Sequence, residues 1–167
     1  MTDTKEEDQL IKVLNGEDDL GAVIRAHIHI EAALNDFIEE LFEFPDFLDK
    51  IRLEFHEKIL LAQAIGLKTE YAKPLNTLGT LRNNFAHRIE TTLGKNEVDS
   101  LYKSFDGEDK QIIQNAYLRT KKSEKMKGPK SVTKLNPREQ FTLIAISIRQ
   151  ILVAARSELA RTKGGNA

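Results

Sequence analysis

One short segment of the chain brings together three side chains that could do acid–base chemistry at a phosphate group. Arg82, Asn83 and His87 fall within the run Arg-Asn-Asn-Phe-Ala-His. An imidazole titrates near neutral pH and can act as a general base or acid. A guanidinium can hold a phosphate and offset the negative charge that develops on it, and the neighbouring amide can orient either group. This segment is therefore the candidate functional centre of the sequence.

The helix expected to carry this segment does not by itself bring the arginine and the histidine together. Pro74 suits the first turn of a helix, and the pattern after it predicts a helix that runs through the segment. At about 100° per residue, Arg82 and His87 lie about 140° apart around the helix axis. They can approach one phosphate only if the helix ends near Ala86, if the long Arg82 side chain wraps round, or if a second subunit supplies one of them.

The longest predicted helix contributes a second polar feature. His27 and Glu31 project from the centre of its apolar stripe. His27 is typical of a hydrogen-bonded interior histidine rather than a metal ligand. An unpaired buried carboxylate costs free energy, and an arginine on a neighbouring helix could satisfy it with a charge-assisted hydrogen bond. We therefore hypothesise a Glu31–Arg82 ion pair, with Glu31 and His27 supporting the site.

The elements that must position these residues are helices. Apolar residues recur at three- and four-residue spacing, and no stretch shows the sustained alternation of a strand, so the sequence predicts an all-α helical bundle. The last helix, opened by Asn136 and Pro137, is apolar on nearly every side and lies either in the middle of the bundle or against a second subunit. The expected helices cover about residues 17–43, 55–65, 95–105, 108–120 and 137–161, besides the one that begins at Pro74.

Length and composition indicate one domain with uneven charge. The 167 residues are enough for a single core, and we expect an acidic N-terminal segment at 1–16 followed by a helical domain at 17–163. Residues 1–50 carry 14 acidic and 4 basic side chains, whereas residues 51–167 carry 12 acidic and 21 basic ones. Either the two halves pack against each other's field, or the basic half meets a polyanion.

A lysine-rich stretch late in the chain is the expected contact for such a polyanion. The region at about 121–134 is too polar and too charged to pack, so it is predicted to be a flexible basic loop. It contains no aromatic residue, so neither base stacking nor sequence readout is expected. The alternative is a solvated connector without a partner. The candidate RNA-binding residues are Arg88, Lys121, Lys122, Lys125, Lys127 and Lys130.

Several classes of function are excluded or disfavoured. The absence of cysteine excludes disulfides, thiol nucleophiles and thiolate metal sites. No pair of histidines has zinc-site spacing with a further ligand close by, and no glycine-rich phosphate loop occurs, so we expect neither a metal nor a cofactor. No apolar run approaches the length of a membrane span, and the acidic N-terminus is unlike a secretory signal, so a cytoplasmic protein is expected.

Three stretches resemble one family of helical proteins. HIHIEAALNDFIEEL, FHEKILLAQAIGL and LNTLGTLRNNFAHR are similar, in this order, to the HEPN superfamily of up-and-down helical bundles. The family's marker is an arginine, a polar residue, a few more residues and a histidine, and Arg82, Asn83 and His87 take these three places. The resemblance covers roughly residues 17–90. The mannitol operon repressor family, a group of bacterial regulators, is similar over the same region.

The resemblance implies a function as well as a fold. Active HEPN proteins cleave RNA without a metal, and their site usually forms across a homodimer, so RNA and a second copy become expected partners. A toxin or defence role, with an antitoxin protein as a further partner, is implied in the same way. The resemblance to the mannitol operon repressor family implies instead a non-enzymatic regulator acting through protein partners. A HEPN scaffold that only binds RNA or small nucleotides is a third possibility.

Overall fold

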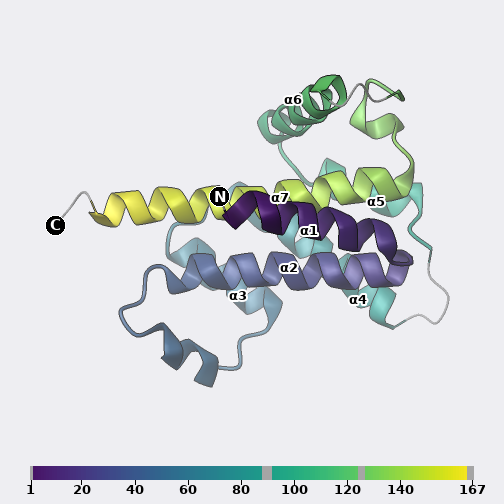
Figure 1. Ribbon diagram of the computed structural model, residues 1–167. Coiled ribbons are helices and arrows are strands. Elements are labelled where there is room, and N and C mark those ends of the chain that lie inside the picture. The colour runs from purple at the N-terminus through teal and green to yellow at the C-terminus, as the bar shows by residue number, and fades with distance from the viewer. Residues whose placement is uncertain (1, 88–91, 124–126, 165–167) are drawn as a thin grey trace.

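The chain folds as a bundle of helices. The computed structural model describes residues 2–87, 92–123 and 127–164, and these ranges contain no strand. The all-α prediction is therefore confirmed for the described part of the chain (Figure 1). The α-helices are α1 (Thr2–Gly16), α2 (Asp19–Glu39), α3 (Phe55–Ala64), α4 (Ala72–Ala86), α5 (Lys95–Lys103), α6 (Gly107–Ser123) and α7 (Pro137–Gly164). Short 3-10 helices occur at η1 (Pro45–Lys50), η2 (Thr69–Tyr71) and η3 (Val132–Lys134).

Helix α2 is the element that most of the bundle packs against. Its start is set by Asp18, whose carboxylate accepts a hydrogen bond from the Gly21 backbone N–H at 2.7 Å. Its buried face then contacts α1, α3, α4 and α7. The helix ends at Glu39 instead of residue 43, because tighter hydrogen bonds such as the one from the Phe42 N–H to the Glu39 carbonyl close its last turn.

Helix α7 lies in the middle of the bundle. This is one of the two positions that its apolar sequence predicts, the other being an interface with a second subunit. Asn136 caps it, since the Glu139 N–H donates to the Asn136 Oδ1 at 2.8 Å. The helix contacts α1, α2, α5 and α6, which accounts for apolar residues on nearly all of its sides. Although α7 is 28 residues long, neither it nor any other helix in the described ranges is apolar enough to cross a membrane.

Ion pairs join the acidic first part of the chain to the basic remainder. Arg138, at the start of α7, contacts Asp19 at 2.9 Å, and Arg156, farther along α7, contacts Glu40 at 3.0 Å. These pairs link the two ends of α2 to α7. At these two places, ion pairs between acidic residues of the first fifty and basic residues of α7 hold the two parts of the chain together.

Residues 2–16 form helix α1, which lies against the bundle. Helix α1 packs against α2 and α7, and its Leu10 and Leu14 are fully buried. The Arg138 guanidinium donates hydrogen bonds to the backbone carbonyls of Leu14, Glu17 and Asp18, which fixes the turn between α1 and α2. The two leucines are four residues apart and therefore lie on the same face of α1, which they bury against the bundle.

The described parts of the basic region at 121–134 include the end of α6, the short helix η3 and a segment that is hydrogen-bonded to α6. Helix α6 continues to Ser123, and the chain after the undescribed residues 124–126 returns along α6. There the Tyr117 hydroxyl donates to the Pro129 carbonyl at 2.8 Å, and the buried Val132 donates from its N–H to the Gln114 Oε1 at 3.0 Å. Figure 1 shows α6 and this returning segment on the side of α7 away from α2.

Shortening a buried leucine in α1 tests whether this helix stabilises the domain. Leu14→Ala is expected to lower the free energy of unfolding by about 2 to 4 kcal/mol, because it removes buried methyl groups and leaves a cavity. Leu60→Ala on α3 is the matched control, since Leu60 is 53% exposed and its loss is expected to cost less than about 1 kcal/mol. Urea unfolding measures both values. Equal, small losses would mean that α1 does not pack as described.

Candidate functional site

Helices α2, α3 and α4 enclose a polar hollow of about 500 Å³. Helix α2 contributes His27 and Glu31 to its wall, and α4 contributes Arg82 and Asn83. Helix α3 forms the third side. The residues that line this polar hollow are His27, Glu31, Glu54, Phe55, His56, Asn76, Gly79, Thr80, Arg82 and Asn83.

Two local features bring α3 close to α4 at the hollow. A reciprocal capping box starts α3: the Glu54 N–H donates to the Glu57 side chain at 2.8 Å, while the Glu54 side chain accepts from the Glu57 backbone. Opposite this start, Gly79 of α4 faces the Phe55 ring. A Cβ atom at Gly79 would lie 3.1 Å from that ring, so glycine permits the close approach of the two helices.

His27 is the most buried polar group of the hollow. The residue is 2% exposed, and its ring lies 4.3 Å from the Phe55 ring, centroid to centroid. Its Nδ1 lies 3.6 Å from a Glu31 carboxylate oxygen, whereas its Nε2 is buried without a hydrogen-bond partner among the described residues. Burial, and next the positive charge of Arg82, lowers the pKa of His27 to about 4. The imidazole is therefore neutral at neutral pH.

Glu31 is paired with Lys58 and not with Arg82. The Lys58 Nζ lies 2.6 Å from the Glu31 Oε1, and both side chains are largely buried. The hypothesised Glu31–Arg82 ion pair is wrong, because α3 runs beside α2 and brings a lysine to the carboxylate. Arg82 lines the same hollow, yet it forms no ion pair with any described carboxylate. No carboxylate in the described part of the chain therefore occupies its guanidinium.

The structure brings Arg82 and Asn83 into the hollow and leaves His87 outside it. Arg82 is half-buried, Asn83 is exposed, and both line the polar hollow. Helix α4 ends at Ala86, as one of the three conditions for convergence requires, and the His87 N–H donates to the Asn83 carbonyl at 3.2 Å. His87 is nevertheless exposed and is absent from the wall of the hollow. Within one chain, the end of the helix does not bring His87 to the place that Arg82 lines.

Reasoning from sequence missed a second imidazole in the hollow. His56 is exposed, and its Nδ1 lies 2.9 Å from the Asn76 Oδ1. The Asn76 amide nitrogen donates to the Ala72 carbonyl, so its oxygen is the acceptor, and His56 must donate from Nδ1. In this tautomer Nε2 carries no hydrogen and is the acceptor nitrogen of the ring. His56 and Asn76 are twenty residues apart and share no motif, so only the packing of α3 on α4 pairs them.

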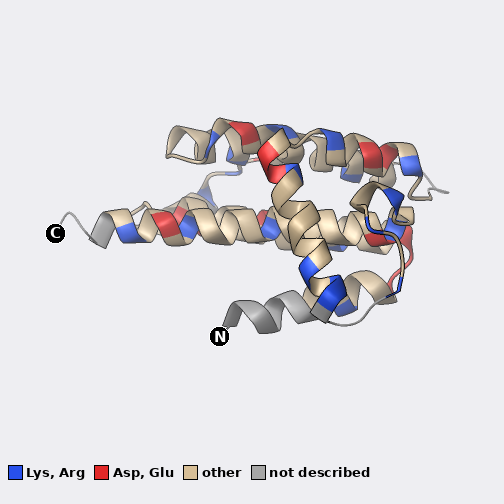
Figure 2. Ribbon diagram, turned by 90° about the horizontal axis from the view of Figure 1, so that it is seen from above, with Lys and Arg blue, Asp and Glu red and all other residues tan. Residues whose placement is uncertain are grey.

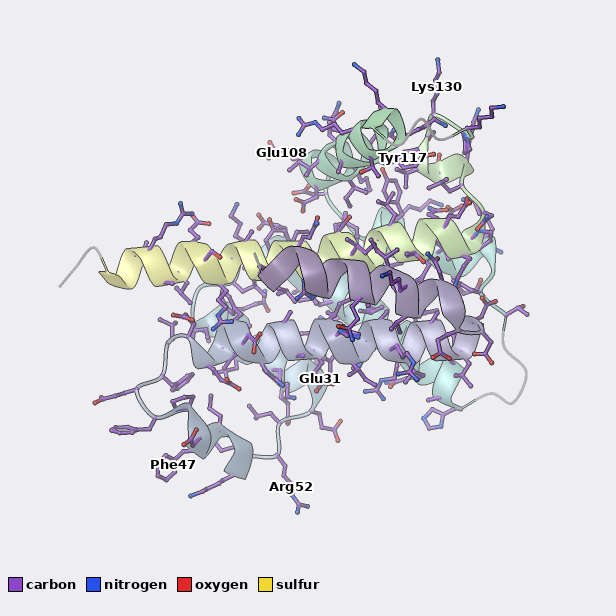
Figure 3. The ribbon with its side chains drawn as sticks, in the orientation of Figure 1. Glu31, Phe47, Arg52, Glu108, Tyr117 and Lys130 are labelled. Carbon is purple, nitrogen blue, oxygen red and sulfur yellow. The ribbon has the colours of Figure 1, made fainter. Side chains whose placement is uncertain are left out.

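The four described lysines that were predicted to bind RNA do not border the hollow. Lys122, Lys127 and Lys130 are exposed, whereas Lys121 donates a hydrogen bond to the Pro129 carbonyl at 3.1 Å. Figure 2 shows α6 crossing α7, with acidic residues at its first turn and basic residues at its last. In Figure 3, Lys130 lies on the side of α7 that carries α6, whereas Glu31 lies on the side of α2 that faces away from α7. The remaining two predicted residues, Arg88 and Lys125, lie outside the described residues.

Comparisons with known proteins identify no relative. No family model, no curated protein and no solved structure matches the chain. Among the described residues, no group of three or more histidine, aspartate or glutamate side chains is placed to hold a metal ion. The function is therefore inferred from the site itself and from the resemblance of its motif.

Burial of a neutral His27 predicts a loss of stability in mild acid. The pKa of this residue falls from 6.5 to about 4 on folding, so between these values the unfolded chain holds a proton that the folded protein lacks. The free energy of unfolding is expected to fall by up to about 3 kcal/mol as the pH drops through this window, beyond the effect of other groups. Urea unfolding of wild type and His27→Gln, at neutral pH and at about pH 4.5, measures the His27 contribution.

The variant is expected to lose less stability over this range than wild type does. His56→Gln is the control, because His56 is exposed and folding does not remove its ring from water as it removes that of His27. The stability of this variant should depend on pH as that of wild type does. A pH dependence in His27→Gln equal to that of wild type would contradict the assignment.

The pairing of Glu31 is tested by two double-mutant cycles. Glu31→Gln combined with Lys58→Gln is expected to give a coupling energy of about 1 kcal/mol, since the pair is close and largely shielded from water. Glu31→Gln combined with Arg82→Gln is expected to give less than about 0.5 kcal/mol. The free energies of unfolding of the single and double variants supply both values. A larger coupling to Arg82 than to Lys58 would restore the original hypothesis.

Proposed function

We propose that the chain is a HEPN-like RNA-binding protein that cleaves RNA without a metal, at a site shared by two copies. Arg82 and Asn83 of one copy would meet His87 of the other. The observation that carries the proposal is the position of Arg82, which lines a polar hollow with no carboxylate partner among the described residues. The resemblance of the motif to the HEPN marker supplies the reaction.

Arg82 suits the phosphate of the scissile bond. The Glu31 charge is met by Lys58 at 2.6 Å, so it does not occupy the guanidinium. His27 beside it is neutral at neutral pH, so Arg82 and Lys58 are the cations that act on the inner part of the hollow. A guanidinium held there can bind two phosphate oxygens and stabilise the charge of the transition state.

The imidazole moves the protons of the reaction. A base takes the proton of the 2′-hydroxyl, and the oxygen attacks the adjacent phosphorus while the bond to the 5′-oxygen breaks. The leaving oxygen takes up a proton, and the products are a 2′,3′-cyclic phosphate and a free 5′-hydroxyl. His87 is exposed at the end of α4, where it can reach a neighbouring molecule more readily than the hollow of its own chain.

The basic residues at the end of α6 and in the segment that follows it would serve longer RNA rather than the reaction centre. Lys122, Lys127 and Lys130 are exposed and lie apart from the hollow. Their charges attract phosphates without regard to sequence, and the attraction weakens as salt is added. Such a protein would be toxic unless restrained, so we expect a protein antitoxin as its partner.

A regulator that acts through protein partners is the second candidate function. Apolar side chains are exposed in and around η1, where Figure 3 shows Phe47 pointing away from the bundle. Phe44 and Phe47 are each at least 60% exposed, and the Lys50 Nζ lies 4.3 Å from the Phe47 ring. Exposed aromatic side chains within one short segment favour a protein interface.

Cleavage of mixed RNAs in excess chelator tests the enzyme hypothesis. Wild type is expected to cleave and to leave 2′,3′-cyclic phosphate ends, whereas Arg82→Ala and His87→Ala each lose about 100-fold or more. Asn84→Ala is the matched control, because Asn84 lies within the motif but does not line the hollow. His56→Ala shows whether the imidazole already in the hollow contributes. If folded wild type does not cleave, the regulator becomes the better proposal.

Mixing the two inactive variants tests whether the site is shared. Half of randomly paired dimers then contain one copy of each variant, and each mixed dimer holds one complete site, so about a quarter of wild-type activity should return. No return of activity, with both variants folded and dimeric, would place Arg82 and His87 of one chain in the same site.

A further inference from the structure

A second cavity lies between α6 and α7, apart from the polar hollow. This α6–α7 cleft has a volume of about 500 Å³ and is also bordered by η2 and the end of α2. It shares no lining residue with the polar hollow. An inference about the cleft therefore does not depend on the proposed function.

The walls of the cleft are largely apolar. Ile112 and Ile113 of α6 face Ile151 and Leu159 of α7 across it. Ile112 is 64% exposed, so this large apolar side chain is left in water beside an unfilled space. Helix α6 packs against α7 and against η3, which leaves this part of its face uncovered. A ligand with an apolar body would remove that surface from water.

One end of the cleft carries a largely buried acidic residue, Asp109, whose carboxylate is held by no hydrogen bond or ion pair from a described residue, although the charge of Lys68 acts on it. Asp109 belongs to α6 and is 8% exposed. Its backbone N–H donates to the Asp106 side chain at 2.8 Å, which holds the first turn of α6 in place. Burial, followed by the charges of Asp106 and Glu70, raises the pKa of Asp109. A buried anion without a partner favours a ligand that brings a positive charge.

The surroundings of Asp109 add to the negative field. Glu158 of α7 also lines the cleft, and Lys68 is the cation among the described lining residues. The pKa of Tyr71, at the same end, is raised first by burial and then by the charges of Asp109, Glu70 and Asp106. Acidic groups therefore outnumber the exposed Lys68 around this end.

We propose that the α6–α7 cleft binds a small organic cation, an amine on an apolar body. The ammonium group lies against Asp109 and the apolar body lies between Ile112 and Ile151. A cavity of this size fits a small molecule, since ligand pockets usually measure about 300 to 1,000 Å³. The carboxylate supplies charge recognition and the isoleucines supply the contact area.

Titration with three matched probes tests the charge requirement. Phenethylamine, phenethyl alcohol and phenylacetate have similar apolar bodies and differ in charge. Amide NMR spectra of the full chain are expected to shift at the cleft with phenethylamine, with a dissociation constant in the millimolar range. The alcohol should bind about ten-fold more weakly and the carboxylate should not bind. Equal binding of amine and alcohol, or no shifts at the cleft at tens of millimolar, would overturn the proposal.

Two variants and one control locate the binding. Asp109→Asn is expected to weaken phenethylamine about ten-fold, to the level of the alcohol. Glu108→Gln is the matched control, because it removes the same charge one residue away, outside the cleft, and should change affinity less than two-fold. Ala154→Leu, which places a larger side chain in the cleft, should abolish binding of both probes. Unchanged affinity in Asp109→Asn, or equal losses in it and in Glu108→Gln, would overturn the assignment.

Discussion

Burial of one face of α2 is the constraint on which the rest of the structure depends. This face packs against α7, the helix it contacts most extensively, and against α1, α3 and α4. The apolar residues on it, among them Ile30, Leu34 and Phe37, are almost completely buried, and the hydrophobic effect makes this burial the main favourable term. Once α2 is placed in this way, the polar residues on the same face are largely removed from bulk water and must be accommodated by neighbouring helices.

The polar hollow follows from that accommodation. His27 stays in the buried face by remaining neutral, so its burial makes the free energy of unfolding fall in mild acid. Glu31 keeps its charge because Lys58 of α3 meets it at 2.6 Å. Glu31 and Arg82 line the same hollow, and because Glu31 pairs with Lys58, the Arg82 guanidinium has no ion-pair partner among the described residues. The supporting charges thus determine what the arginine can bind.

Helix α6 makes its main contacts with α7 and the short η3 helix. Hydrogen bonds from Gln114 and Tyr117 hold the segment around Pro129 and Lys130 against it. Its first turn places Asp109 beside the α6–α7 cleft, and its last turn carries lysines on the opposite end (Figure 2). One helix therefore presents an acidic end to a cavity and a basic end to solvent. Neither end shares surface with the polar hollow.

The sequence by itself determined the helical class, most helix positions and the residues of the motif. Periodicity and caps such as Asp18 and Asn136 act locally, so they can be read without knowledge of the fold. Tertiary packing alone decided that Lys58 and not Arg82 meets Glu31, that His56 pairs with Asn76, and that α1 joins the core. It also decided that Arg82 enters the polar hollow while His87 does not. These outcomes depend on which helices pass side by side, and residues distant in the chain carry no local signal of their neighbours.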